Sequence, residues 1–422
     1  MPYWNVETEA LLERYERIRD FTEELCEPLE IEDHVVQSMP DASPAKWHLA
    51  HTTWFFERFI LQEQFGAEPV DERYNFIFNS YYNAAGDQFS RPDRGVLSRP
   101  TVGEIYDYRS QVDARMGELL TSEEIERPET AAHVDLGLHH EQQHQELLVT
   151  DMKHMFGQNP LHPEVVDERE PAGRNREAGD LRWRDLGGGE CEVGYGGDDF
   201  AFDNERPRHT VRQRPFQLAS RPVTCGEYVE FIEDGGYERV ELWLSDGWAT
   251  VQERGWDSPM YWKKVDGDWH IYTLAGLRQV DPHEPLAHVS YYEADAFAEW
   301  AGARLPTEQE WEIAAQAEPL AGHFAESGRR HPARRSGDEN GELSQMFGDV
   351  WEWTASAYSP YPGFERFPGK IGEYNGKFMC NQYVLRGGSC ATPESHIRRT
   401  YRNFFYPHSR WQFSGFRLAR DA

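Results

Sequence analysis

The segment Leu138–Glu146 reads LHHEQQHQE and lies within a stretch, about residues 129–156, whose apolar residues predict one long helix. His140 and His144 are four residues apart, so their rings project from the same face of a helix. Two imidazoles at this spacing can hold one metal ion, and they suit zinc, iron, copper or nickel better than calcium or magnesium. The segment therefore predicts a helix that carries part of a metal site.

A third ligand is expected on another helix. The pair Ser43-Pro44 predicts where that helix starts, because serine is a frequent N-cap and proline fits the first helical position. His51 follows on an aromatic, apolar face, where a lone basic group would be costly to bury. Together, His51, His140 and His144 would leave coordination positions open for substrates. The alternative interpretations are that the spacing of His140 and His144 arises by chance or on a solvent-exposed face, and that His51 is a core histidine satisfied by hydrogen bonds.

The first 160 residues contain four amphipathic segments. Their apolar residues recur every three or four positions, over residues 11–25, 43–59, 101–119 and 129–156. Thr101 and Glu104 predict a capping box at the start of the third segment. A long irregular connection, about residues 64–100, separates the second segment from the third. This pattern predicts a four-helix bundle.

The rest of the chain has a different composition. Residues 163–182 are charged, contain proline and glycine and lack periodicity, which indicates a linker. Residues 183–422 are rich in Gly, Trp and Tyr, with short strand-like runs and helices expected at Tyr291–Trp300 and Thr307–Ala315. The predicted fold class is therefore α+β, with a helical domain at residues 1–162, the linker, and a second domain after it.

Charge and targeting signals limit the possible partners. The 422 residues include 43 Lys+Arg and 74 Asp+Glu, a formal net charge of −31, which disfavours binding to nucleic acid or to an anionic membrane. No stretch approaches the ~20 apolar residues of a membrane span, and the start lacks the apolar core of a signal peptide. The five cysteines are scattered without a CxxC pair. We therefore expect a cytoplasmic protein.

Two sets of motifs resemble known domains. The segment Trp47–His51 (WHLAH) with His140–His144 (HEQQH) resembles the DinB-type bundle of the ergothioneine-pathway sulfoxide synthases. The C-terminal part resembles the formylglycine-generating-enzyme domain, a C-type-lectin-like fold. The motifs that carry this second resemblance are Arg304–Trp311 (RLPTEQEW), Gly348–Thr354 (GDVWEWT), Arg386–Ser389 (RGGS) and Gly415–Ala419 (GFRLA). The resemblance covers nearly the whole chain, and the fusion of the two halves in this order is specific.

The resemblance implies a non-haem Fe(II) enzyme. Such enzymes join a thiol to hercynine, the N-α-trimethylated form of histidine, with dioxygen as the oxidant and a sulfoxide as the product. Carried over by motif, His51, His140 and His144 are the iron ligands. The substrates would be hercynine, cysteine or γ-glutamylcysteine, and O2.

The resemblance also implies roles in the long connection of the bundle. Arg91 and Arg94 match the family arginines that hold the carboxylate of the thiol substrate, a task suited to the planar guanidinium group. Tyr81 and Tyr82 resemble a tyrosine pair that donates a proton or hydrogen atom to the oxygen species. Surface ion pairs and core packing are the alternative interpretations of these residues.

Four further residues are implied as contacts of hercynine. Gln143 matches a family glutamine that contacts the hercynine imidazole. Asn403 would hydrogen-bond the carboxylate of hercynine. Phe404 or Phe405 would face its trimethylammonium group, which cannot donate hydrogen bonds and is best held by aromatic faces.

Two departures from the γ-glutamylcysteine branch favour free cysteine as the thiol. That branch typically carries a Trp-Asp pair where this chain has Phe404 and Phe405, and an arginine near the place of Ser409. This chain also has the segment Gly372–Phe378 (GEYNGKF) where that branch places its own catalytic tyrosine. Relatives that install selenium, or that act on histidine to make ovothiol, remain alternatives.

Other classes of function stay open at this point. The HEQQH segment could belong to a zinc hydrolase with Glu141 as the base, but no downstream zincin ligand follows it. Formylglycine generation needs a late pair of cysteines, whereas only Cys390 follows the RGGS motif. A DinB-type thiol transferase with zinc or nickel would leave the second domain without a task. A lectin-like binding module would leave the histidines and arginines unexplained.

Overall fold

The computed structural model describes residues 4–167, 176–335 and 343–422. The chain divides into two compact units. We call the first the bundle unit; it comprises Met1–Gln158, Gly196–Asp203 and Glu365–Lys377. The second, the mixed unit, comprises Asn159–Tyr195, Asn204–Phe364 and Phe378–Ala422. Two short segments from later in the sequence, Gly196–Asp203 and Glu365–Lys377, therefore pack with the N-terminal helices.

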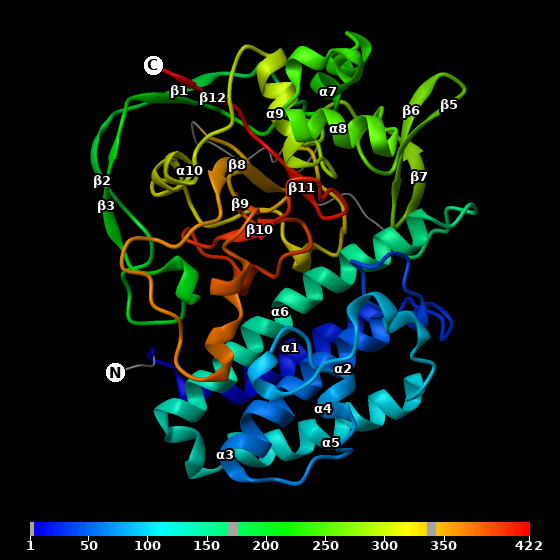
Figure 1. Ribbon diagram of the computed structural model, residues 1–422, viewed down its shortest axis with the longest axis vertical. Helices are drawn as coiled ribbons and strands as arrows, with labels where there is room; N and C mark the ends of the chain where they lie inside the picture. The colour runs from blue at the N-terminus through cyan, green and yellow to red at the C-terminus, as the bar shows by residue number, and fades with distance from the viewer. Residues whose placement is uncertain (1–3, 168–175, 336–342) are drawn as a thin grey trace. The chain divides into compact units, whose positions relative to one another are not determined.

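The long helices of the bundle unit lie alongside one another (Figure 1). They are α1 (Leu11–Cys26), α2 (Ala45–Phe56), α5 (Val102–Leu120) and α6 (Pro128–Gly157). A π-helical turn, Glu57–Gln62, continues α2, and the short helices α3 (Glu63–Phe65) and α4 (Tyr74–Ile77) follow it. The four amphipathic segments that the sequence predicts are thus all helical.

The helix starts confirm one predicted cap and correct another. Thr101 and Glu104 form the expected capping box, because each side chain bonds the backbone N–H of the other. At α2, however, the N-cap residue is Pro44 and no side chain caps the helix, so the prediction of Ser43 as the N-cap is wrong. Ser43 is used elsewhere: its backbone N–H donates to Asp151 at 2.8 Å.

A buried ion-pair cluster holds α6 against α1 and α5. The carboxylate of Glu141 is fully buried and accepts hydrogen bonds from Arg19 at 2.9 Å, from Arg109 at 2.7 Å and from Thr22 at 2.7 Å. Burial alone would raise the pKa of Glu141, but the guanidinium groups of Arg109 and Arg19 lower that pKa to about 2. The cluster therefore keeps a charged Glu141 on the side of α6 that faces these two helices.

A glycine sets the distance between α6 and α2. A Cβ atom on Gly137 would lie 2.6 Å from the Phe56 ring and 3.1 Å from the Phe55 ring, so a side chain at this position would push the helices apart. Gly137 is three residues before His140. The close approach of the two helices thus occurs beside the histidine segment.

The mixed unit combines helices with small sheets. Its helices are α7 (Cys225–Glu233), α8 (Ser245–Arg254), α9 (Tyr291–Trp300) and α10 (Glu308–Ala315). Its sheets have the strand orders β1-β4-β12, β10-β9-β8-β11, β2-β3 and β5-β6-β7. The strands are β1 (Trp183–Leu186), β2 (Gly189–Val193), β3 (His209–Gln213), β4 (Phe216–Ala219), β5 (Trp262–Val265), β6 (Asp268–Thr273), β7 (Gly276–Gln279), β8 (Trp351–Ala357), β9 (Tyr383–Arg386), β10 (Asn403–Phe405), β11 (Ser414–Gly415) and β12 (Ala419–Asp421).

The centre of the mixed unit is built around β8. Within its sheet β8 pairs antiparallel with β9 and parallel with β11. Glu352 on this strand is fully buried and accepts hydrogen bonds from Trp311 of α10 at 2.8 Å and from Arg417 at 2.6 Å. A polar core of this kind needs its partners in place, since an unpaired buried charge is costly. Within the described ranges, no helix has the length and apolar character of a membrane span.

We expect Glu141→Gln to lower the free energy of unfolding by about 3 kcal/mol, because it leaves two buried guanidinium groups without their shared carboxylate. Urea unfolding of the metal-free protein measures the change. Glu118→Gln on the exposed side of α5 removes the same charge and should stay within about 0.5 kcal/mol of the parent chain. Equal stabilities of the two variants would contradict the structural role of the cluster.

Candidate metal centre and substrate pocket

One pocket of the bundle unit contains the three histidines singled out by the sequence. It encloses about 410 Å³ of empty space, its open mouth included. The described residues that line it are Ser43, Trp47, His48, His51, Ser80, Tyr81, Tyr82, Arg91, Arg94, His140, His144, Leu147, Asp151 and Tyr374. The pocket therefore combines imidazole, guanidinium and phenol groups.

His51 is fixed by aromatic rings and by the backbone. Its ring stacks on Trp47 at 4.5 Å between centres and on Trp54 at 5.5 Å. Its Nδ1 donates a hydrogen bond to the carbonyl oxygen of Phe78 at 2.6 Å. Because Nδ1 carries the proton, Nε2 is left with its lone pair.

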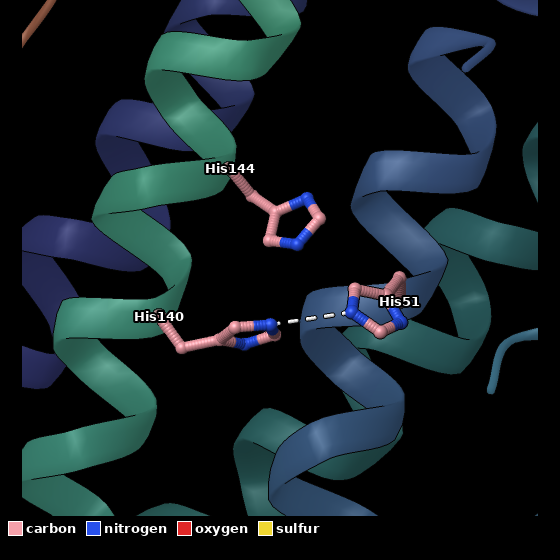
Figure 2. A group of neighbouring side chains, drawn as sticks. All are labelled: His51, His140 and His144. Atoms are coloured by element: carbon pink, nitrogen blue, oxygen red, sulfur yellow. Dashed lines mark hydrogen bonds between the residues drawn. The ribbon is translucent and has the colours of Figure 1, made fainter. Parts of the chain in front are cut away.

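The other two histidines come from successive turns of α6 and point toward His51 (Figure 2). The Nε2 atoms of His51 and His140 are 3.2 Å apart. One nitrogen of each ring of His51, His140 and His144 can be chosen so that the three atoms all lie within 4.8 Å of one another. The four-residue spacing of His140 and His144 along α6 thus directs both rings toward His51 on α2.

Burial keeps these rings neutral. It lowers the pKa of His140 to about 4. Burial, followed by the effect of His140, lowers the pKa of His51 well below its ordinary range. Burial, followed by the effects of His51 and His140, does the same for the pKa of His144. Neutral imidazole is the form that binds metal ions.

The triad fits a metal ion by its donor chemistry. Two Nε2 atoms 3.2 Å apart face each other in a buried site, an arrangement that a shared cation would satisfy. Glu141, by contrast, is committed to Arg19 and Arg109, so it is not placed to act as the base of a zinc hydrolase. The triad can therefore bind a metal ion without using the zincin chemistry.

Two arginines enter the same pocket from a 3-10 helix, Arg91–Val96. The Arg94 guanidinium donates to Ser43 Oγ and Ser80 Oγ, each at 2.8 Å, and lies 3.4 Å from the centre of the Trp47 ring. Arg91 donates to the hydroxyl oxygen of Tyr81 and to the carbonyl oxygen of Asp41. Among the described residues, neither arginine forms an ion pair with a carboxylate.

The lack of an anionic partner shows in the electrostatics of Arg94. Only 3 % of this residue is exposed. Burial, followed by the positive charge of Arg91, lowers the pKa of the Arg94 guanidinium to about 9. A carboxylate brought into the pocket would relieve both effects. The two arginines thus form a site that is suited to an anion.

The tyrosine pair lies at one side of this pocket. Tyr81 has a backbone φ of 66°, a strained value for a residue other than glycine. Tyr82 is buried among the rings of Trp54, Phe55 and Phe59. Burial raises the pKa of its phenol well above the ordinary value, so Tyr82 stays protonated.

Sequence reasoning missed a third phenol. Tyr374 belongs to the segment Glu365–Lys377 of the bundle unit and lines the pocket, with its ring 6.1 Å from that of Tyr81. Lys377 and Glu373 of the same segment hold the loop that contains Tyr81, because Lys377 donates to the carbonyl oxygen of Tyr81 and Glu373 accepts from the Asn83 backbone N–H at 3.2 Å. The signal was present in the GEYNGKF motif, which therefore no longer argues for cysteine over γ-glutamylcysteine.

The expected contacts of hercynine are placed differently. Gln143 lies on α6 before His144, but it is not among the described residues that line the pocket. Asn403, Phe404 and Phe405 form strand β10 of the mixed unit. Phe404 stacks on Tyr358 at 4.1 Å, and Asn403 Oδ1 accepts a hydrogen bond from the Phe404 backbone. The roles of these four residues stay predictions.

We expect His140→Ala to weaken binding of a divalent transition metal by more than about 100-fold, because a ligand is lost rather than one of its supporting groups. Anaerobic calorimetric titration measures the affinity, and circular dichroism checks that the helices persist. His133→Ala on the same helix, outside the pocket, is the matched control. Full-affinity binding by His140→Ala would refute the metal site.

Comparisons with known proteins agree with the two-part architecture. Residues 14–148 match the DinB superfamily, and residues 185–422 match the sulfatase-modifying factor enzyme 1-like domain. The α+β fold predicted from the motifs is thereby confirmed, with a helical DinB bundle and a β-containing second domain.

Three similar proteins are enzymes by name. The chain is 32 % identical to hercynine oxygenase from Mycolicibacterium smegmatis, over 91 % of this chain and 92 % of that protein. It is 31 % identical to hercynine oxygenase from Mycolicibacterium thermoresistibile, over 90 % of this chain and 88 % of that protein. The formylglycine-generating enzyme of Streptomyces coelicolor is 31 % identical and covers 62 % of this chain and 95 % of its own length.

The two hercynine oxygenases match both halves of the chain, whereas the formylglycine-generating enzyme matches less than two thirds of it. Similarity over the whole length decides between a fused oxygenase and a separate binding module. The chain therefore belongs to the hercynine oxygenase family and is an oxygenase, an oxidoreductase.

Proposed function

We propose that this enzyme joins hercynine to cysteine in ergothioneine biosynthesis and that it depends on Fe(II) and O2. A carbon–sulfur bond replaces the hydrogen on the imidazole carbon between the two ring nitrogens. The C–H bond and the thiol S–H bond break as the C–S bond forms, which supplies two electrons, and oxidation of the sulfur to the sulfoxide supplies two more. One atom of O2 enters the sulfoxide, and the other leaves as water with the two hydrogens. The relatives named hercynine oxygenase, and an ergothioneine biosynthesis protein of Schizosaccharomyces pombe that is 29 % identical over 53 % of this chain, support the pathway.

One observation carries the proposal. Two arginines, the half-buried Arg91 and the buried Arg94, line the same pocket as the histidine triad and have no carboxylate partner in the described chain. A thiol with an α-carboxylate can place its acid on the arginines while its sulfur lies toward His51, His140 and His144. A bound ferrous ion would supply open positions for thiol and dioxygen.

The chain's own residues would do the remaining work. Neutral imidazoles of the triad hold the metal, and the arginines fix the orientation of the thiol substrate. One of the three phenols that line the pocket, Tyr81, Tyr82 or Tyr374, would deliver a proton. Gln143, Asn403, Phe404 and Phe405 are proposed contacts of hercynine, the last two through its trimethylammonium group.

Cysteine is proposed over γ-glutamylcysteine on the remaining sequence departure. Phe404 and Phe405 stand where the γ-glutamylcysteine branch typically has a Trp-Asp pair. Neither phenylalanine offers the polar contacts that a glutamyl arm would need. Histidine or a selenium donor as substrate are the further alternatives.

The test is anaerobic loading with Fe(II), followed by oxygen, hercynine and either cysteine or γ-glutamylcysteine, with products identified by mass spectrometry. We expect hercynyl-cysteine sulfoxide from cysteine. A γ-glutamyl product alone would contradict the choice of thiol, and no sulfoxide from either thiol despite bound iron would overturn the proposed reaction.

We expect Arg91→Met to raise the KM for the thiol about 10–100-fold, because a charge-assisted hydrogen bond contributes about 1.5–3 kcal/mol. The KM for hercynine should change little. Initial rates of oxygen uptake at varied thiol concentration measure both constants. Arg99→Met on the same loop removes an exposed arginine and serves as the control. An unchanged thiol KM in Arg91→Met would contradict the carboxylate site.

We expect Tyr81→Phe to slow carbon–sulfur bond formation about 100-fold or to divert the enzyme to oxidation of its thiol, since it removes a proton donor near the triad. Tyr82→Phe and Tyr374→Phe test the other two phenols in the same assay. The ratio of sulfoxide to oxidised thiol is measured by mass spectrometry. If all three variants keep the parent rate and product ratio, no phenol of this pocket is the donor.

A further inference from the structure

A chain of hydrogen bonds runs behind one of the three histidines. His144 Nδ1 lies 2.9 Å from Nδ1 of His48, a residue of α2. His48 Nε2 lies 3.0 Å from Oδ2 of Asp151, two turns further along α6. His48 is 2 % exposed and Asp151 is 6 % exposed, so water does not compete for these contacts.

For a neutral His48 imidazole, the donors and acceptors in this chain can be assigned. A carboxylate only accepts hydrogen bonds, so His48 Nε2 carries a proton and donates a hydrogen bond to Asp151 Oδ2. In a neutral imidazole the other nitrogen is then an acceptor, so His48 Nδ1 receives its hydrogen bond from His144 Nδ1. This arrangement leaves Nε2 of His144 with its lone pair. The chain therefore selects the tautomer of His144 that can bind a metal ion through Nε2.

The same aspartate reaches the arginine site. Asp151 Oδ2 also accepts from the Ser43 backbone N–H at 2.8 Å, and Ser43 Oγ accepts from Arg94 at 2.8 Å. A second connection runs through Trp47, whose ring contacts the Arg94 guanidinium and stacks on His51. The triad and the arginine site thus share their supporting residues.

The three histidines differ in how they are held. His51 is fixed by a backbone carbonyl, which no side-chain substitution removes. His140 Nδ1 is buried without a hydrogen-bond partner among the described residues. Among the described residues, His144 is the member of the triad whose Nδ1 is hydrogen-bonded to a side chain, so this hydrogen bond can be tested by substitution.

We propose that His48 and Asp151 are positioning residues that fix the tautomer and ring orientation of His144 and tie the metal triad to Arg94. The link to Arg94 rests on the proposed binding of a thiol carboxylate there. The effect on His144 rests only on the triad as a metal site.

The direct test compares two substitutions of His48 in an anaerobic titration with Co²⁺, followed by the absorption of the bound ion. We expect His48→Leu to raise the Kd for Co²⁺ about 10–100-fold, as loss of a supporting group typically does. His48→Gln should retain most of the affinity, because its amide offers one acceptor for His144 and one donor for Asp151. A folded His48→Leu variant with the parent Kd and absorption would overturn the proposal.

A double-mutant cycle tests the order of the chain. Asp151→Asn should weaken Co²⁺ binding in the parent protein but have little further effect in the His48→Leu background, because Asp151 acts through His48. An equal loss of Co²⁺ affinity in both backgrounds would overturn the proposal that Asp151 acts through His48. Asp107→Asn, an exposed aspartate on α5, is the control for charge. Circular dichroism of each metal-free variant separates loss of binding from loss of fold, and His48→Gln keeps the test decisive if His48→Leu does not fold.

These titrations contain no hercynine, thiol or oxygen. A negative sulfoxide assay with normal Co²⁺ results would overturn the proposed reaction and leave the positioning role intact. A normal sulfoxide assay with an unchanged Kd for Co²⁺ in all variants would support the proposed reaction and overturn the positioning role of His48 and Asp151.

Discussion

The ion-pair cluster of Glu141 is the constraint on which the geometry of the histidine triad depends. Helix α6 carries His140, Glu141 and His144 within five residues, and each neighbouring position points about 100° away from the last. Because Arg19 and Arg109 hold Glu141 from one side, the histidines must face another. The rotation of α6 is thus set by a buried charge, and the direction of the imidazoles follows from it. Glu141, which the sequence offers as a possible catalytic base, therefore has a structural role.

The pocket next to this helix has an unusual balance of charge. Its lining includes three imidazoles kept neutral by burial and the guanidinium groups of Arg91 and Arg94. Asp151 is the acidic residue among the described lining residues, and its Oδ2 accepts from His48 and Ser43. Neither arginine forms a direct ion pair with it, although at Arg91 the effect of burial is outweighed by Tyr81 and Asp151, which raise the pKa of that guanidinium. At Arg94, burial and the charge of Arg91 lower the pKa, so an anionic ligand would supply the partner that this group lacks.

The sequence predicted the elements with strong local signals. Helical periodicity located the four long helices, and the Thr101–Glu104 capping box began where expected. The spacing of His140 and His144 fixed their common face without any tertiary knowledge. The prediction of Ser43 as the N-cap was wrong because two residues distant in sequence bind it instead. Its backbone N–H donates to Asp151, and its hydroxyl oxygen accepts from Arg94. Tertiary contacts of this kind leave no local pattern. Nor did any local pattern predict that residues 365–377 pack in the bundle unit, which brings Tyr374 into the pocket.

A crystal structure with anomalous scattering at the iron edge, from crystals grown anaerobically with Fe(II) and cysteine, tests the account most directly. We predict one iron peak among His51, His140 and His144, and the cysteine carboxylate on Arg91. Iron bound elsewhere, or a carboxylate that leaves the arginines vacant, would contradict it.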